Sequence, residues 1–179
     1  MPLPSFILTD SEGTPRSFPT GRHTLLIFWW SECPTCRLSL PVIAAACRTY
    51  SGQLELWLIA QEPSTDLQAL RTGEFTCPIL DDGLLQTSWR FGIDAVPTII
   101  LADPQGEELI RFVGFTPGHW DELFAEAARL TGATPPSLDW SSYPAWRPGC
   151  GPRNFLPETY ERLAAALGPF QPPPGGNAR

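Results

Sequence analysis

The chain has 179 residues, of which 42% are hydrophobic and 17% charged, a composition typical of a globular protein long enough to bury a core. The formal net charge is −7 and all 12 basic residues are Arg. An acidic chain of this kind argues against nucleic-acid binding, which needs clustered positive charge. The absence of Lys from the sequence excludes Schiff-base chemistry and the phosphate-binding P-loop, both of which need that side chain.

The first part of the chain alternates between segments that predict strands and helices. An apolar run rich in β-branched and aromatic residues predicts a fully buried central strand. The segment that follows this strand has apolar residues at helical spacing and predicts a helix. Pro41 lies inside that helix and should kink it. In order, we expect two extended pieces within 5–20, a strand at 23–30, a helix at 34–50 and a strand at 53–60.

The next part continues this alternation and ends in a hairpin and a helix. A turn signal at 103–106 separates two apolar runs and therefore predicts the hairpin. In order, we expect a short helix at 64–71, a short strand at 77–80, a helix at 84–91, hairpin strands at 97–102 and 108–113, and a helix at 117–130. This order predicts an α/β fold with a central mixed sheet and helices on both faces.

The composition changes after Gly132. Residues 133–156 are rich in Pro, Gly, Ser and aromatic residues, 157–167 predict one more short helix, and 169–179 predict a loose tail. We therefore divide the chain into a domain at 1–132 and a C-terminal extension at 133–179. The extension has too few periodic apolar residues to fold alone, so its aromatic side chains should bury their area on the main domain: Trp140, Tyr143, Trp146 and Phe155.

No segment of the sequence has the character of a membrane span or a signal peptide. The longest apolar run, at 25–30, is far short of the ~20 residues that cross a bilayer. The N-terminus lacks a basic stretch followed by an apolar segment. We expect a cytoplasmic protein, or an extracytoplasmic one if a leader was removed before this numbering begins.

One close cysteine pair, Cys33-Pro34-Thr35-Cys36, carries the chemistry. Zinc also uses this spacing, but it needs two more ligands, and the sequence offers no second close pair and only two His. The pair lies where a predicted strand ends and a helix begins, so Cys33 should sit at the positive end of the helix, which stabilises a thiolate. We expect Cys33 to attack a disulfide and Cys36, one turn deeper, to resolve the mixed disulfide.

Here the sequence resembles the thioredoxin superfamily. Residues 28–37 (FWWSECPTCR), followed by Pro41, are similar to that family's active-site strand and kinked helix, and Val96-Pro97-Thr98 resembles its cis-proline loop. The long gap between these motifs, and the opening residues, resemble the TlpA/ResA-like branch. The resemblance implies a thioredoxin-like fold over about 5–131, a redox-active centre without metal or organic cofactor, and substrate binding at Val96 and a cis Pro97.

Several residues depart from the family pattern or lie beside the pair. Ile27 stands where thioredoxins carry a buried acid, so proton transfer to Cys36 needs another group or water. Glu32 replaces the usual Trp, and a carboxylate there would oppose thiolate formation if it pointed inward. Near-site modulators are expected to be Trp30, Glu32, Pro34 and Thr35.

The three other cysteines are interpreted separately. Cys47 and Cys77 are expected to pack in the core. Cys150 lies between two glycines with Arg147 and Arg153 nearby, which would favour a thiolate. Two readings stay open: an incidental free cysteine, or a third functional thiol that lies near the active site and relays electrons.

The function predicted from these residues is thiol–disulfide exchange with protein or small-molecule thiol and disulfide substrates and with a redox partner. Two alternatives were weighed. Thiol peroxidases of the peroxiredoxin type carry Thr or Ser three residues before the reactive cysteine, where this chain has Trp30. A redox-inactive thioredoxin-fold binding module would instead act through its Pro-rich tail or aromatic extension.

Overall fold

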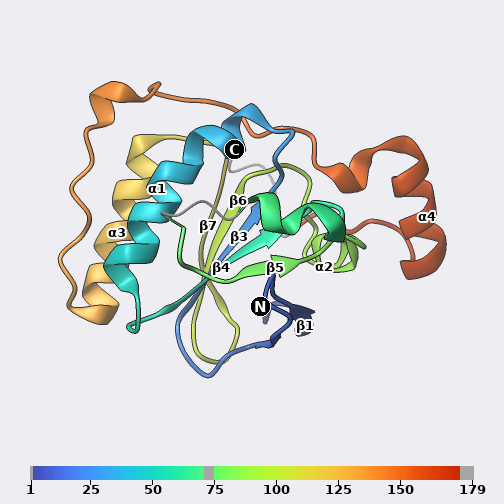
Figure 1. The fold of residues 1–179 in the computed structure, drawn as a ribbon, viewed down its shortest axis with the longest axis horizontal. Helices are drawn as coiled ribbons and strands as arrows, with labels where there is room; N and C mark the ends of the chain where they lie inside the picture. Colours follow the sequence, from blue (N-terminus) through green and yellow to red (C-terminus); the bar gives the residue numbers. More distant parts are fainter. Residues whose placement is uncertain (1, 71–74, 174–179) are drawn as a thin grey trace.

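The computed structural model describes residues 2–70 and 75–173, and its centre is a five-stranded mixed sheet in the order β5-β4-β3-β6-β7 (Figure 1). A separate two-stranded sheet joins β1 to β2. The strands are β1 (Phe6–Thr9), β2 (Pro15–Phe18), β3 (Thr24–Trp29), β4 (Glu55–Ala60), β5 (Ile79–Asp81), β6 (Thr98–Ala102) and β7 (Glu108–Val113). The α-helices are α1 (Pro34–Tyr50), α2 (Gln86–Arg90), α3 (Pro117–Thr131) and α4 (Pro157–Leu167).

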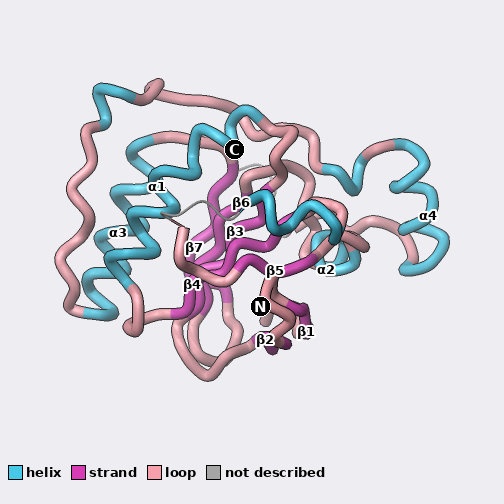
Figure 2. Tube along the Cα trace, viewed as in Figure 1, coloured by secondary structure: helices cyan, strands magenta, loops and turns pink. Residues whose placement is uncertain are grey.

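Strand β3 is the middle of the sheet, as its apolar sequence predicts. All six of its residues are buried, and it pairs in parallel with β4 and antiparallel with β6. Figure 2 shows β3 among the other strands of the sheet. Strand β4 in turn pairs in parallel with β5, and β6 antiparallel with β7. This arrangement confirms the predicted mixed sheet and the 97–113 hairpin, and it makes the end of β3 a rigid base for the residues that follow.

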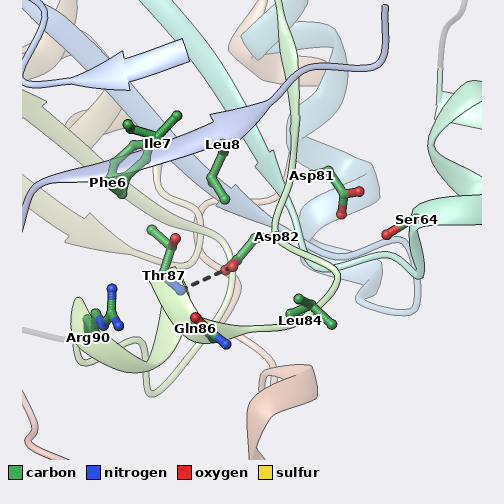
Figure 3. A pocket seen from close by; sticks show the side chains of 10 residues that line it. All are labelled: Phe6, Ile7, Leu8, Ser64, Asp81, Asp82, Leu84, Gln86, Thr87 and Arg90. Atoms are coloured by element: carbon green, nitrogen blue, oxygen red, sulfur yellow. Dashed lines mark hydrogen bonds between the residues drawn. The ribbon is translucent and has the colours of Figure 1, made fainter. Parts of the chain in front are cut away.

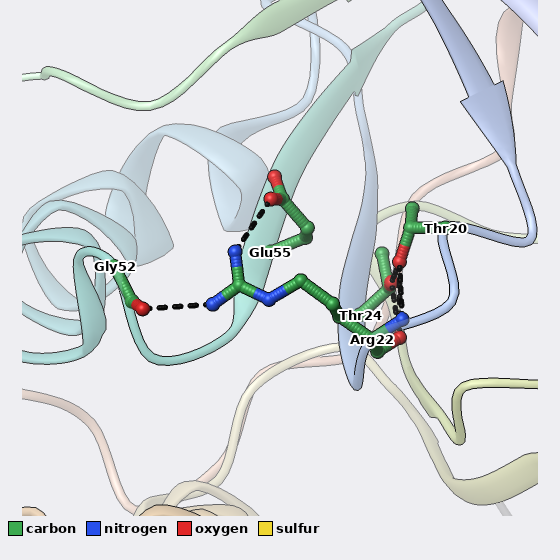
Figure 4. A network of polar contacts seen from close by, with 5 residues as sticks. All are labelled: Thr20, Arg22, Thr24, Gly52 and Glu55. Carbon is green, nitrogen blue, oxygen red and sulfur yellow. Dashed lines mark hydrogen bonds and ion pairs between the residues drawn. The ribbon is translucent and has the colours of Figure 1, made fainter.

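An arginine fastens the start of β3 to β4. Arg22 Nη1 lies 3.1 Å from Glu55 Oε1, and Arg22 Nη2 donates to Gly52 O at 2.7 Å (Figure 4). On the other side of Arg22, its backbone N–H donates to Thr20 Oγ1. These contacts are at the opposite end of β3 from the cysteine pair, and they set the register with which β3 enters the sheet.

Helices cover both faces of the sheet, as expected. Helices α1 and α3 lie together on one face, where the rings of Tyr50 and Phe124 are 6.3 Å apart, and α2 lies on the other with α4 beyond it (Figure 1). The Trp89 ring of α2 lies 5.0 Å from Tyr160 of α4. Leu85, Trp89 and Leu163 form a small second core. No helix in the described part of the chain is long and apolar enough to cross a membrane.

The extension runs from α3 across the end of the sheet where α1 begins, and then to α4 (Figures 1 and 2). On the α3 side, Tyr143 stacks on Phe115 with ring centroids 5.5 Å apart, and Trp140 Nε1 donates to Asp121 Oδ1. On the α4 side, Phe155 contacts Tyr160 at 5.7 Å. Trp140 and Tyr143 therefore contact Phe115 as predicted, whereas the ring contacts of Phe155 lie within the extension and its side chain is 37% exposed.

Three expectations about this region and its neighbours need revision. Trp146 is 62% exposed, so it does not anchor the extension. Phe170, in the segment expected to be loose, packs its ring 5.1 Å from Trp89, because the second core offers it an apolar partner. The helix expected at 64–71 is a 3₁₀ helix at Ser64–Leu70; residues 71–74 and 174–179 lie outside the described part of the chain.

A cavity of about 280 Å³ lies between β1 and the start of α2 (Figure 3). Asp82 points into this region, where it accepts hydrogen bonds from the backbone N–H of Thr87 and of Ser88. Burial raises the pKa of Asp82 to about 6, although those hydrogen bonds oppose the rise. None of the residues lining the cavity is among those predicted to form the active site. The two backbone hydrogen bonds show that Asp82 caps the first turn of α2.

Candidate active site

Cys33 is the N-cap residue of α1, at the end of the loop that leaves β3. Its backbone is extended, and its sulfur accepts a hydrogen bond from Cys36 N at 3.2 Å. Pro34 occupies the first turn, where it needs no hydrogen-bond acceptor. The loop between β3 and Cys33 is closed by a hydrogen bond in which Cys33 N donates to Trp30 O at 3.1 Å. This position gives the Cys33 sulfur the N–H donor and the positive helix end that stabilise a thiolate.

Cys36 is a free thiol in the first turn of α1 and is 0% exposed. Burial strongly raises its pKa, and the nearby Glu62 carboxylate raises it further, while a backbone hydrogen bond from Trp30 and the charge of Arg37 act in the opposite direction. The turn that holds it is tied to β3 by Trp29 Nε1, which donates to Cys36 O at 2.7 Å. Trp29 thus fixes the turn that carries Cys36, and burial favours the thiol form of this residue over the thiolate.

The cis-proline loop lies beside Cys33. The Val96–Pro97 bond is cis, as the family resemblance predicts, and Val96 O lies 3.3 Å from Cys33 Sγ. Thr98 Oγ1 donates to Ala95 O at 2.7 Å and fixes the turn before the bond. The loop and the helix start, although 63 residues apart in sequence, form one site.

The disulfide in this structure joins Cys33 to Cys150, with the two Cα atoms 5.8 Å apart. Sequence reasoning expected the exchanging disulfide to be Cys33–Cys36; in this state Cys36 is the thiol instead. Cys150 lies well within the roughly 7 Å that a disulfide allows between Cα atoms. The open question about the path of the extension is thereby answered, because the extension crosses the active-site face.

The segment around Cys150 pairs with the cis-proline loop like a short strand. Val96 N donates to Cys150 O at 2.9 Å and Cys150 N donates to Val96 O at 2.7 Å, an antiparallel bridge. A second bridge joins Phe115 to Arg147, with both hydrogen bonds at 2.9 Å. Between the two bridges, Thr35 Oγ1 donates to Pro148 O at 2.8 Å. The predicted modulator Thr35 thus contacts the extension.

Two glycines permit this close crossing. A Cβ at Gly149 would lie 2.9 Å from Val113 Cγ1 and 3.0 Å from Ala95 Cβ. A Cβ at Gly114, whose φ is +77°, would lie 2.6 Å from Arg147 O. Any side chain at either position would therefore force the segment and the main domain apart.

The extension is also held just after Cys150 by a buried polar network. Asn154 is 0% exposed; its Oδ1 accepts from Gln61 Nε2 at 2.9 Å, and its Nδ2 donates to Ile93 O at 2.9 Å. The neighbouring Arg153 N donates to Gln61 Oε1 at 2.8 Å. Because Gln61 directly follows β4, the network fixes the extension to the sheet.

The other residues predicted to modulate the site lie next to Cys33 and Cys36 in the sequence and differ in exposure. Trp30 is half-buried against the core, whereas Glu32 and Pro34 are exposed. Cys47 and Cys77 were expected to be separate core residues, but they form a second disulfide with Cα atoms 5.9 Å apart. No cluster of three or more His, Cys, Asp or Glu that could hold a metal ion is found within residues 2–70 and 75–173.

Sequence reasoning missed Glu62, which is 4% exposed. Its carboxylate accepts from Ser31 N at 2.6 Å and from Ser31 Oγ at 2.7 Å, in the loop that leads to Cys33. With Ile27 at the place of the usual buried acid, Glu62 is the carboxylate that acts on Cys36. No sequence signal marked it, because an acidic residue after a strand is ordinarily a surface residue.

Comparison with known proteins supports this geometry. No family model matches. The chain is 31% identical over 109 residues, 58% of its length, to the thiol-disulfide oxidoreductase ResA of Halalkalibacterium halodurans, covering 61% of that protein. It is 54% identical over 37 residues, 21% of its length, to the thioredoxin-like protein YosR, derived from the SPbeta prophage of Bacillus subtilis, covering 46% of that protein. The chain thus spans less than two thirds of the length of these relatives.

Solved structures agree on the fold. A putative thiol:disulfide interchange protein DsbE from Chlorobium tepidum superposes with a TM-score of 0.64 at 24% identity, covering 73% of this chain and 96% of that one. StoA from Bacillus subtilis gives 0.57 at 24% identity, covering 67% and 93%. The chain therefore has a thioredoxin-like fold.

Proposed function

We propose that this thioredoxin-fold protein, similar in sequence to a ResA thiol–disulfide oxidoreductase, is itself a thiol–disulfide oxidoreductase that works through Cys33 and Cys36. The main support for the proposal is the position of the Cys33 sulfur. This sulfur lies at the N-terminus of α1, accepts the Cys36 N–H, and is next to the cis Val96–Pro97 bond. An inert structural cysteine has no need of this combination.

The reaction follows from the different surroundings of the two sulfurs. The Cys33 thiolate attacks a sulfur of a substrate disulfide, forms a mixed disulfide and expels one substrate thiolate. Cys36 then loses its proton and attacks Cys33, which releases the second substrate thiol and leaves a Cys33–Cys36 disulfide. Burial raises the pKa of Cys36, so this second thiol must lose its proton before it attacks.

The substrate class is a polypeptide or small molecule with a thiol or disulfide, and a separate redox partner restores the enzyme. Val96 supports the polypeptide case, because its N–H and C=O already pair with an extended segment of the chain. The acidic charge of −7 argues against nucleic acid as a partner. The chemistry proposed here requires neither metal nor organic cofactor.

The cellular location stays a prediction. The sequence predicts the cytoplasm unless a leader was removed, whereas the Cys47–Cys77 disulfide favours an oxidising compartment, where structural disulfides persist. We propose the oxidising compartment on that ground. The redox state of Cys47 and Cys77 in protein taken directly from its native cells would decide between the two.

The two alternatives fit the structure less well. A peroxiredoxin-type site needs a hydroxyl three residues before the reactive cysteine, and the residue there is the half-buried Trp30. A redox-inactive binding module would not require a free buried thiol beside a disulfide-bonded cysteine. Peroxide consumption, measured beside disulfide exchange, separates the first alternative from the proposal.

The proposal is tested by turnover of a disulfide-bonded peptide with dithiothreitol as electron donor. We expect the full chain to be active, and Cys33→Ser to lose more than about 10³-fold, because the attacking sulfur is removed. Cys47→Ser is the matched control on the same helix and should retain activity. An inactive full chain, or an active Cys33→Ser variant, would contradict the proposal. The reduction potential of the Cys33–Cys36 couple should lie between about −120 and −270 mV.

A further inference from the structure

The active-site end of the molecule is occupied by its own chain. Residues 147–150 pair through Cys150 with Val96 of the cis-proline loop and through Arg147 with Phe115, which follows β7, and Cys150 is bonded to Cys33. In this state Cys33 is 1% exposed and Cys36 0%, whereas Cys150 is half-buried. Of these three cysteines, Cys150 is therefore the one with part of its surface open to an external thiol.

We propose that Cys150 is the third redox cysteine of this protein, through which electrons pass between external partners and the Cys33–Cys36 pair. The inference rests on the proposed function and deepens it. Cys150 is presented to Cys33 in the way an extended substrate would be, and Asn154 and Tyr143 fix the extension on either side of it. The disulfide is thus an intramolecular mixed disulfide awaiting attack.

The internal step is a disulfide exchange that needs no added oxidant. Cys36 loses its proton and attacks Cys33 Sγ, the Cys33–Cys150 bond breaks, and Cys150 leaves as a thiolate that takes up a proton. The products are a Cys33–Cys36 disulfide and a Cys150 thiol. The reverse step, attack of the Cys150 thiolate on Cys33, regenerates the state of this structure.

The external step uses a partner dithiol. One partner thiolate attacks Cys150 Sγ, and Cys33 leaves as a thiolate stabilised by the N–H of Cys36, which makes it the better leaving group. The second partner thiolate then attacks the partner's own sulfur in the new mixed disulfide and releases Cys150. Two electrons pass to the protein, and the partner is left as a disulfide. The same steps in reverse reduce a partner disulfide.

The test compares turnover of the disulfide-bonded peptide by the full chain, Cys150→Ser and Cys150→Ser/Gly151→Cys. In Cys150→Ser the backbone bridge to Val96 remains, so Cys33 stays covered without an exchanging sulfur, and turnover should fall by about tenfold or more. The double variant moves the thiol by one residue, to a position whose Cβ meets no atom within 4 Å. Successive residues of an extended strand point to opposite sides, so it should not rescue.

Disulfide mapping of the oxidised Cys36→Ser variant provides the second readout. With no resolving thiol, Cys33 should be recovered bonded to Cys150. Unchanged turnover of Cys150→Ser, full rescue by the double variant, or absence of the Cys33–Cys150 peptide would each overturn the relay. Each would leave the proposed function intact as long as Cys33→Ser is inactive and the full chain is active. An inactive full chain would overturn both.

Discussion

Helix α1 has a disulfide-bonded cysteine at each end, and the two cysteines differ in their hydrogen bonds and in whether a free thiol lies nearby. Cys33 caps the N-terminus, accepts the Cys36 N–H and has the Cys36 thiol one turn away. Cys47 lies in the last turn, its bond to Cys77 contacts Thr76 Oγ1 at 3.5 Å, and it has no third cysteine beside it among the described residues. The Cα separations are nearly equal, 5.8 and 5.9 Å.

Position on the helix, and not the Cα separation, distinguishes the disulfide proposed to exchange from the other one. The N-terminal end of a helix stabilises a leaving thiolate, and the C-terminal end, which is negative, opposes one. A free thiol that could resolve the disulfide, Cys36, is also present only at the N-terminal end of α1 among the described residues. The Cys47–Cys77 bond therefore ties α1 to the segment before β5, while the Cys33–Cys150 bond has the surroundings that the proposed exchange reaction needs.

Between the two ends of α1, the largest difference is expected in the rates at which the two disulfides are reduced. With limiting dithiothreitol at neutral pH, Cys33–Cys150 should open about 10²-fold faster than Cys47–Cys77, because Cys33 is the better leaving group. Alkylation at timed intervals, followed by mass mapping, gives both rates. Equal rates would break the comparison, since they would mean that the helix ends do not control reactivity.

An intermediate effect is expected when the extension is released. Asn154→Ala removes two buried hydrogen bonds and leaves Ile93 O without that donor, which should lower the free energy of unfolding by about 2 kcal/mol. It should also shift oxidised protein from Cys33–Cys150 toward Cys33–Cys36, while Cys47–Cys77 stays formed. Urea unfolding and disulfide mapping measure the two changes.

The matched control for that experiment is Trp146→Ala. Trp146 and Asn154 are each four residues from Cys150 in the sequence, but Trp146 is 62% exposed and Asn154 is buried. Loss of the Trp146 side chain should therefore change the free energy of unfolding by less than about 0.5 kcal/mol. A similar loss of stability in both variants would show that general packing of the extension, and not the Asn154 network, positions Cys150.

The smallest expected effect is the change in the rate of Cys36 attack for each pH unit. Burial raises the pKa of Cys36, so below that pKa its thiolate fraction, and with it the rate of Cys36 attack on the Cys33–Cys150 disulfide, should rise about tenfold per pH unit. The rise should be present between pH 7 and 9 and be measurable by acid-quenched mapping. A rate that is flat over this range would mean that Cys36 is already a thiolate.

Much of the fold could be predicted because its signals are local. The apolar run of β3, the turn before β7 and the helical spacing of α3 each depend on neighbouring residues, and the structure has all three elements. The placing of Cys33 at a helix start and the cis Pro97 also followed from short motifs. The division at residue 132 into domain and extension stays a prediction.

The parts of the site that could not be predicted depend on contacts between distant segments. The Cys33–Cys150 pair is separated by 117 residues and the Cys47–Cys77 pair by 30, and neither spacing marks a partner. The role of Glu62 depends on how the end of β4 lies against Ser31. The irregular sequence of the extension carried no periodicity from which its path could be read.

The two glycines at the crossing have a consequence for selectivity. Because a Cβ at Gly149 would meet Val113 and Ala95 within about 3 Å, the channel between β7 and the cis-proline loop admits only bare backbone at that point. A foreign polypeptide that took the place of residues 147–150 would meet the same two side chains. A residue larger than glycine before its cysteine would therefore require Val113 or Ala95 to shift, so the backbone spacing at this point disfavours bulky residues there.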